Sequence, residues 1–120
     1  MTETILVVDD DEALRTVIVE VLRNKDYCVL EASDGERGLE ALMDNPGRID
    51  LVIVDWELPK LRGLEVGKLA QLCDNGLKVL LISGHEPDPR GLAFLAKPFA
   101  IDKLLATVAR LLAEPAKVNA

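Results

Sequence analysis

The chain has 120 residues, 49% of them hydrophobic and only four aromatic, which suits one domain with an aliphatic core. Its net charge of −7 argues against nucleic-acid binding, because the phosphate backbone attracts clusters of Lys and Arg, and here 14 basic residues stand against 21 acidic ones. No apolar run approaches the ~20 residues of a membrane span and no leader pattern is present, so we expect a cytoplasmic protein that contacts no membrane.

The first half of the chain alternates predicted strands and helices. Residues 5–8 are apolar at every position, as in a strand buried on both faces, and lead directly into Asp9, Asp10, Asp11 and Glu12. A helix is predicted from Glu12, capped by Asp11, with one inward stripe made of Leu14, Val17, Ile18, Val21 and Leu22. Residues 27–31 form a weaker strand near a sheet edge, and residues 35–43 form a helix whose inner face carries Leu39, Leu42 and Met43.

The second half repeats this alternation, with strands at residues 51–54, 79–82 and 94–96 and helices at residues 64–74 and 101–112. The strands end in Asp55, Ser83-Gly84 and Lys97-Pro98, respectively. The first of these helices is expected to turn Leu69, Leu72 and Cys73 inward. The inner face of the last helix consists of Ile101, Leu104, Leu105, Val108, Leu111 and Leu112, and a short tail begins near Pro115.

Five strands joined by helices predict an α/β fold, a doubly wound parallel sheet, in one domain of residues 1–120. The connection from Ser83 to Gly91 breaks the pattern, because it is shorter than the dozen or so residues that a parallel crossover needs. Pro87 and Pro89 also remove backbone donors and restrict the residues before them. We therefore expect at most one helical turn there and a fourth helix that is reduced or absent.

Acidic residues gather at one place if the first and third strands are neighbours, because the carboxyl ends of parallel strands meet at one edge of the sheet. Asp9, Asp10 and Asp55 would then converge. Two carboxylates about 4 Å apart repel by roughly 4 kcal/mol at an effective dielectric constant near 20, so three together require a cation. Oxygen ligands with room for water suit Mg²⁺ or Mn²⁺ rather than zinc, and such a site accepts phosphoryl oxygens.

The ends of the last two strands supply what phosphoryl transfer still lacks. Ser83 offers a hydroxyl group to a phosphoryl oxygen. Lys97 offers a fixed positive charge that can pair with Asp55 before transfer and with the phosphate afterwards. The four strand ends together predict a site for metal-dependent phosphoryl transfer.

These residues resemble the receiver domain of two-component response regulators. The resemblance rests on four blocks, which are residues 5–11, Asp55 with Pro59 four positions later, Ser83-Gly84, and residues 94–99. It covers about residues 4–113. It implies a flavodoxin-like five-stranded parallel sheet with the strand order 2-1-3-4-5, and a phosphorylation-dependent signalling switch that is not an enzyme acting on an external substrate.

The resemblance also implies roles for individual residues. Asp55 resembles the phosphoacceptor, and Asp10 the direct carboxylate ligand of Mg²⁺. Asp9 resembles a metal ligand that acts through water, and Glu57 a residue whose backbone carbonyl binds the metal. Ser83 resembles the switch hydroxyl of the family, and Phe94 its switch aromatic. Lys97 resembles the active-site lysine, and its bond to Pro98 is expected to be cis.

Five residues have simpler expected roles. Cys28 and Cys73 are expected to be buried, reduced thiols, because they form no CxxC pair and lie near no histidine cluster. His85, the single histidine, is interpreted as an exposed loop side chain, and Trp56 as a packing residue that shields the acidic pocket. Gly84 gives the backbone after Ser83 extra freedom.

Three other functions are weaker interpretations. A flavin-binding module needs a glycine- and hydroxyl-rich loop after the first strand, where this chain has four acidic residues. A Mg²⁺-dependent phosphohydrolase that forms an aspartyl-phosphate favours a second aspartate two positions after the nucleophile, where Glu57 stands. A receiver-like module that no longer takes phosphate would lack site residues that are all present here.

The resemblance implies a histidine kinase or a histidine phosphotransfer protein as the phosphodonor, and a downstream protein that the sequence does not identify. A homodimer is left open. A stand-alone response regulator is favoured over a receiver cut from a larger protein, because the fold begins close to Met1 and the tail is polar.

Overall fold

The computed structural model describes residues 2–73, 76–84 and 91–115. Its elements follow in the order β1 (Thr4–Val8), α1 (Glu12–Arg23), β2 (Cys28–Ala32), α2 (Gly35–Asp44), β3 (Leu51–Asp55), α3 (Gly63–Cys73), β4 (Lys78–Ser83), β5 (Ala93–Ala96) and α4 (Ile101–Ala113). Each predicted strand and helix is therefore present, and its bounds differ from the predicted ones by at most one residue.

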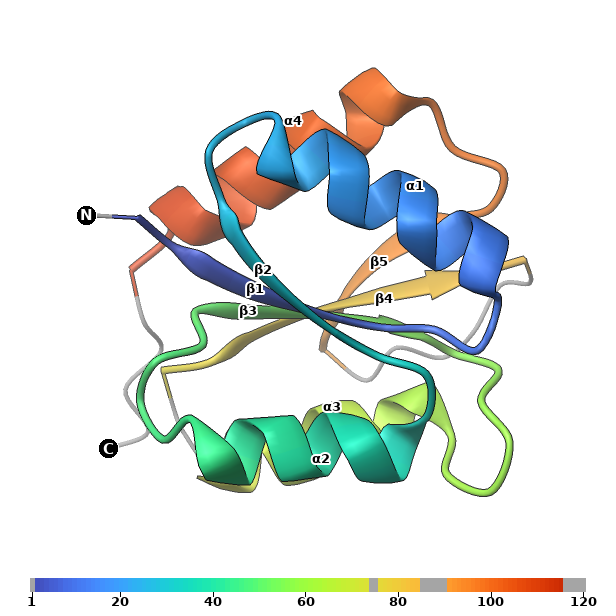
Figure 1. The fold of residues 1–120 in the computed structure, drawn as a ribbon, viewed down its shortest axis with the longest axis vertical. Helices are drawn as coiled ribbons and strands as arrows, with labels where there is room; N and C mark the ends of the chain where they lie inside the picture. The colour runs from blue at the N-terminus through green and yellow to red at the C-terminus, as the bar shows by residue number, and fades with distance from the viewer. Residues whose placement is uncertain (1, 74–75, 85–90, 116–120) are drawn as a thin grey trace.

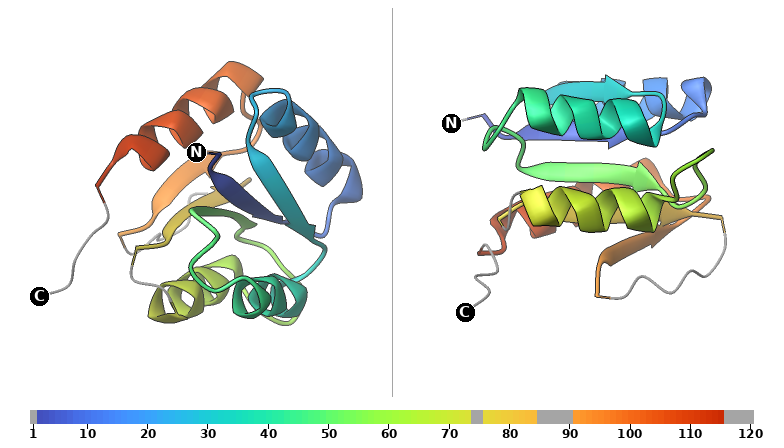
Figure 2. Two further views of the ribbon diagram at one scale, coloured as in Figure 1. Left: turned by 60° about the vertical axis from the view of Figure 1, so that its left-hand side comes forward. Right: turned by 90° about the horizontal axis from the view of Figure 1, so that it is seen from below.

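The five strands form one parallel sheet in the order β2-β1-β3-β4-β5, as expected. Helices α1 and α4 cover one face and α2 and α3 the other, so the sheet is the middle layer of three (Figure 1). Turned views show the pair α2 and α3 side by side on their face (Figure 2). The doubly wound α/β fold is confirmed.

Both faces of the sheet are buried because its strands are apolar at nearly every position. Residues that point to one face pack with α1 and α4, and their neighbours along each strand pack with α2 and α3. The central strands β1 and β3 have no exposed residue. These strands form a rigid base for the residues at their carboxyl ends.

Asp11 caps α1 as predicted, since its side chain accepts a hydrogen bond of 3.1 Å from the backbone N–H of Leu14. The predicted connection between β4 and β5, with His85, Pro87 and Pro89, falls on residues 85–90, which lie outside the described residues. Gly84 and Gly91 flank that stretch, and residues 76–84 and 91–100, which are described, contain no helix. None of the helices in the described part of the chain has the length and apolar composition that a membrane span requires.

The predicted inner face of α3 is wrong at Leu69 and Leu72, and the predicted burial of Cys73 falls on a side chain outside the described ones. Leu72 is 80% exposed and Leu69 is also exposed, whereas the residues that face the sheet are Gly63, Val66, Gly67 and Ala70. A Cβ atom at Gly67 would lie 2.9 Å from Val79 and 3.1 Å from Leu92, so α3 packs too closely on the sheet for larger side chains. The most apolar stripe of this helix is therefore not the one that faces the sheet.

Four other burial predictions are also wrong. On α1, Val17 is exposed and Val19 is buried in its place; on α2, Met43 is 64% exposed; and Ile101 is exposed at the first residue of α4. These residues lie at helix ends or at the margin of the inner stripe, where the sheet no longer covers them. Cys28 is exposed rather than buried, because it is the first residue of the edge strand β2.

Candidate functional site

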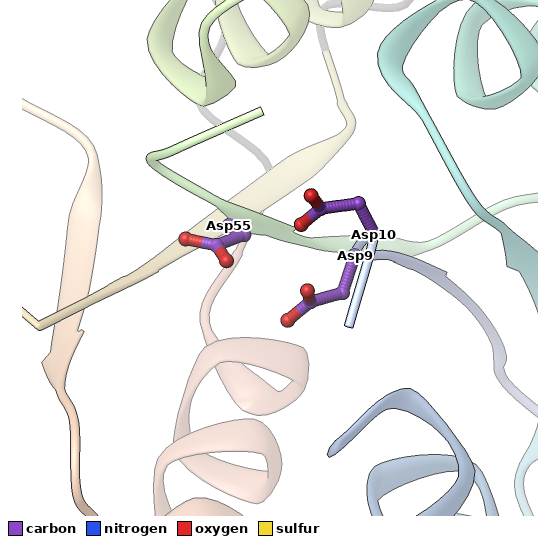
Figure 3. A group of neighbouring side chains, drawn as sticks. All are labelled: Asp9, Asp10 and Asp55. Atoms are coloured by element: carbon purple, nitrogen blue, oxygen red, sulfur yellow. The ribbon is translucent and has the colours of Figure 1, made fainter. Parts of the chain in front are cut away.

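The ends of β1 and β3 bring three carboxylates together. The two strands are direct neighbours in register, with Val8 opposite Val54, so Asp9 and Asp10 follow one strand where Asp55 ends the other. One carboxylate oxygen from each aspartate lies within 4.8 Å of the others. Figure 3 shows the side chains of Asp9 and Asp10 directed toward Asp55 from the neighbouring strand end.

Asp9 is the most buried of the three, with no exposed surface. Its Oδ1 accepts a hydrogen bond of 2.9 Å from the backbone N–H of Asp11, but its buried Oδ2 has no hydrogen-bond partner. Burial raises the pKa of Asp9 to about 6, and the charges of Asp55 and Asp10 act in the same direction, against the Asp11 amide and Lys97.

A buried carboxylate oxygen without a hydrogen-bond donor is costly unless a cation neutralises it. Three aspartates supply hard oxygen ligands, which suit a divalent cation of the Mg²⁺ type better than zinc. The residues that are present therefore fit a metal ion.

Asp55 is held on both of its oxygens. Oδ1 accepts a hydrogen bond of 3.0 Å from the backbone N–H of Glu57, and Oδ2 accepts one of 2.8 Å from Lys97 Nζ. The same ammonium group lies 3.7 Å from Asp9 Oδ2. Burial lowers the pKa of Lys97, but the hydrogen bond to Asp55 and the charges of nearby aspartates outweigh this effect and raise it overall, so the lysine remains charged.

The backbone positions Lys97 beside the carboxylates. Its N–H donates a hydrogen bond of 2.7 Å to the Ser83 carbonyl, directly after β4 and β5 pair through Ser83 and Ala96. The bond between Lys97 and Pro98 is cis, as expected. Ser83 is fully buried at the end of β4, which lies beside β3, so it stands one residue beyond the level of Asp55.

Phe94 lies half-buried on β5, opposite Leu81, and packs with the core on the α2 and α3 side.

Trp56 is also half-buried in that core, and its backbone N–H donates a hydrogen bond of 2.8 Å to the Ile82 carbonyl. Together with Asp10, Glu57, Leu58, Pro59 and Arg62, Trp56 lines a pocket beside the acidic cluster. Trp56 therefore packs next to the site, as the sequence suggests.

Sequence reasoning missed two residues that shape this site. Gly63 is the first residue of α3 and packs against the backbone at the end of β3, where a Cβ atom would overlap with the Asp55 carbonyl oxygen. Arg15 donates a hydrogen bond of 2.7 Å to the Asp9 carbonyl. Both act through backbone atoms, and the only sequence signal was spacing: a glycine eight residues after Asp55 and an arginine one helical turn after Asp11.

The family model described as the response regulator receiver domain matches residues 5–109. Among curated proteins, sporulation initiation phosphotransferase F of Bacillus subtilis (strain 168) is 29% identical over 99% of each chain. Response regulator MprA of Mycobacterium sp. (strain KMS) is 34% identical over 93% of this chain. The chain spans nearly the whole of the first relative but 51% of the second.

Solved structures of receiver domains share the fold of this chain. The receiver domain from hybrid histidine kinase CckA is 39% identical, with a TM-score of 0.83 over 91% of this chain and 98% of that one. Response regulator protein TrrA from Thermotoga maritima, in complex with Mg²⁺ and BeF, is 30% identical, with a TM-score of 0.82 over 92% and 99% of the two chains. The match to the family model runs from the second residue of β1 through β5 and includes the strand ends that carry the acidic cluster, and the chain belongs to the response regulator receiver domain family.

Proposed function

We propose that this receiver domain takes a phosphoryl group on Asp55 and signals through the change in surface that follows. The observation that carries the proposal is the placement of Asp55. Its Oδ2 accepts a hydrogen bond of 2.8 Å from Lys97 Nζ, and one carboxylate oxygen of each of Asp9, Asp10 and Asp55 lies within 4.8 Å of the others. A nucleophilic carboxylate, a fixed cation and a pair of metal-binding acids are the groups that phosphoryl transfer to a carboxylate needs.

The cofactor that suits this site is Mg²⁺, with Mn²⁺ as an alternative. We assign Asp10 and Asp55 as direct carboxylate ligands, Asp9 as a ligand through water, and the Glu57 backbone carbonyl as the remaining protein ligand. Two observations support this assignment: the carboxylate of Asp10 is exposed, and the buried Asp9 Oδ2 accepts no hydrogen bond. The TrrA structure, which contains Mg²⁺ and BeF, supports it by analogy. The ion would neutralise phosphoryl oxygens that the aspartates alone repel.

The donor is expected to be a phosphohistidine, on a histidine kinase or on a histidine phosphotransfer protein. One carboxylate oxygen of Asp55 attacks phosphorus, the phosphorus–nitrogen bond of the donor breaks, and the released imidazole takes up a proton. The product is an aspartyl-phosphate on the receiver. The protein then acts as a phosphoacceptor and not as an enzyme that turns over an external substrate.

The signal arises from the acceptor oxygens and the charge of the phosphate, which carries about −1.5 to −2 charges in place of the single charge of the Asp55 carboxylate. We propose that the Lys97 ammonium moves from carboxylate to phosphoryl oxygen, and that the Ser83 hydroxyl donates to another phosphoryl oxygen. Phe94 would then adjust on β5, because its strand is paired with the strand that carries Ser83. The result is a shift between two existing conformations that a downstream protein, or a second copy of the chain, distinguishes.

The direct test is phosphorylation with a small phosphodonor and Mg²⁺, followed by intact mass spectrometry. We expect one added phosphoryl group per chain that hydroxylamine removes, and no labelling of Asp55→Asn. The matched control is Asp44→Asn, which neutralises an exposed aspartate at the end of α2 and should label normally. Labelling of Asp55→Asn at the normal rate would disprove the assignment, and multiple turnover of small phosphoesters would support the phosphohydrolase alternative instead.

A further inference from the structure

Arg15 connects the acidic cluster to the edge of the sheet. This residue lies on α1, and its guanidinium group donates from Nη1 to the Asp9 carbonyl oxygen at 2.7 Å and from Nε to Glu31 Oε1 at 3.0 Å. The Arg15 side chain is 14% exposed and that of Glu31 is 42% exposed. The guanidinium group therefore stands mostly inside the protein, while its carboxylate partner stands at the surface.

The carbonyl that Arg15 holds belongs to the peptide plane that joins Asp9 to Asp10. Because a peptide unit is planar, fixing its oxygen also restricts how the residues before and after it are oriented. The other polar backbone atom of Asp9 is fixed as well, since its N–H donates to the Ala32 carbonyl at 3.2 Å. The Asp9 backbone is thus held to the end of β2 twice, once directly and once through Arg15 and Glu31.

These contacts bear on the two carboxylates that flank the plane. In Figure 3 the side chains of Asp9 and Asp10 both extend toward the side on which Asp55 lies. A small rotation of the shared peptide would move both at once, and metal sites tolerate such displacement poorly. An ion pair as exposed as Arg15 and Glu31 contributes little by attraction alone. The charge-assisted hydrogen bond to a backbone carbonyl is the stronger contact.

We propose that Arg15, held in place by Glu31, is a positioning residue that presets the Asp9–Asp10 peptide for the divalent cation. Glu31 also balances the guanidinium charge, so that the contact adds little repulsion toward an incoming metal ion. This inference rests on the proposed function, because it assumes that the acidic cluster binds a cation. It assigns Arg15 no contact with the metal or with the phosphoryl group.

The test measures Mg²⁺ affinity through Trp56 fluorescence in the full chain, for wild type, Arg15→Lys, Glu31→Gln and Arg23→Lys. Arg23 is the matched control, because it lies on the same helix and donates to a β2 backbone carbonyl, that of Val29, at 3.1 Å, near the other end of the helix. We expect Arg15→Lys to weaken Mg²⁺ binding about 10-fold, within the range for groups that orient metal ligands. Glu31→Gln should give a smaller loss, and Arg23→Lys none.

A second readout separates positioning from contact with the phosphoryl group. At saturating Mg²⁺, Arg15→Lys should regain the wild-type rate of phosphorylation from a small phosphodonor, whereas loss of a direct contact would persist. Wild-type Mg²⁺ affinity in both Arg15→Lys and Glu31→Gln would overturn the inference, as would equal losses of affinity in Arg15→Lys and Arg23→Lys. If Arg15→Lys does not fold, the Mg²⁺ affinity of Glu31→Gln relative to wild type tests the inference by itself. Failure of wild type to bind Mg²⁺ would overturn the proposed function and this inference together.

Discussion

The ammonium group of Lys97 donates a hydrogen bond of 2.8 Å to Asp55 Oδ2, although the two residues lie at the ends of strands that are not adjacent in the sheet. Lys97 follows β5 and Asp55 ends β3, and β4 lies between the two strands. The backbone of the same lysine is hydrogen-bonded to Ser83 at the end of β4. Lys97 therefore connects the ends of β3, β4 and β5, so the proposed phosphorylation of Asp55 would act on a residue that is hydrogen-bonded to the ends of β3 and β4.

Removal of the Lys97 charge should destabilise the metal-free protein. In Lys97→Met, the buried carboxylates of Asp55 and Asp9 lose their cation, which should cost about 1–3 kcal/mol of the free energy of unfolding. Added Mg²⁺ should recover part of this loss, because it supplies positive charge to the same carboxylates. Urea unfolding followed by Trp56 fluorescence, with EDTA and with Mg²⁺, measures both effects.

The control for this charge is Lys103→Met, which removes an exposed lysine on α4 and should leave the free energy of unfolding within about 0.5 kcal/mol of wild type. Phosphorylation of Lys97→Met should also be slow at saturating Mg²⁺, while Lys103→Met reacts normally. Equal stability of the two variants in EDTA would show that Lys97 does not compensate the aspartates.

Gly63 should tolerate no side chain. A Cβ atom there would overlap with the Asp55 carbonyl oxygen, so Gly63→Ala must move either α3 or the loop after β3. We expect a loss of about 1–3 kcal/mol in the free energy of unfolding, as for other overpacked sites, together with weaker Mg²⁺ binding. Thermal unfolding and Trp56 fluorescence titration check the two effects.

Gly84→Ala is the matched substitution for Gly63→Ala. It lies beside Ser83, yet a Cβ atom at Gly84 would have no heavy atom within 4 Å, and Gly84 does not have a positive φ angle. We expect its stability to stay within about 0.5 kcal/mol of wild type. A loss at Gly84 as large as that at Gly63 would mean that steric overlap is not the cause.

The acidic cluster could be predicted from sequence because strand topology alone determines it. Fully apolar strands must be central, their carboxyl ends meet at one edge, and the acids of residues 9, 10 and 55 follow those ends directly. Lys97 was predictable for the same reason. Arg15 and Gly63 were not, because their contacts are to backbone carbonyls, whose positions depend on the packed structure and not on any residue type in the sequence.

Helix α3 shows a different reason why sequence-based prediction fails, since its leucines at positions 69 and 72 are exposed. We expect Val66→Ala to cost about 2 kcal/mol of the free energy of unfolding, because Val66 is fully buried. Leu72→Gln should cost less than about 0.5 kcal/mol, because Leu72 is 80% exposed. Urea unfolding of both variants tests which stripe of the helix faces the sheet. A larger loss for Leu72→Gln than for Val66→Ala would contradict the observed orientation.

Asp9 should make the metal-free protein less stable as pH rises through the range from its ordinary pKa to its raised one. Burial lifts the pKa of Asp9 from 3.8 to about 6, so between these values the folded state binds the proton more tightly than the unfolded state. The stabilisation from this proton is complete below the unfolded pKa and is lost as pH rises through the folded pKa. The expected loss is about 2 kcal/mol between pH 4 and pH 7, since each pKa unit corresponds to about 1.4 kcal/mol.

Asp9→Asn isolates this effect, because the other carboxyl groups titrate in both proteins. Measured by urea unfolding in EDTA, the variant should gain stability relative to wild type as pH rises from 4 to 7, by about the amount that wild type loses through Asp9. Mg²⁺ binding to wild type should weaken as pH falls below about 6, because protons and metal then compete for the same carboxylate. A stability difference that stays constant across this pH range would show that Asp9 has an ordinary pKa in the folded protein.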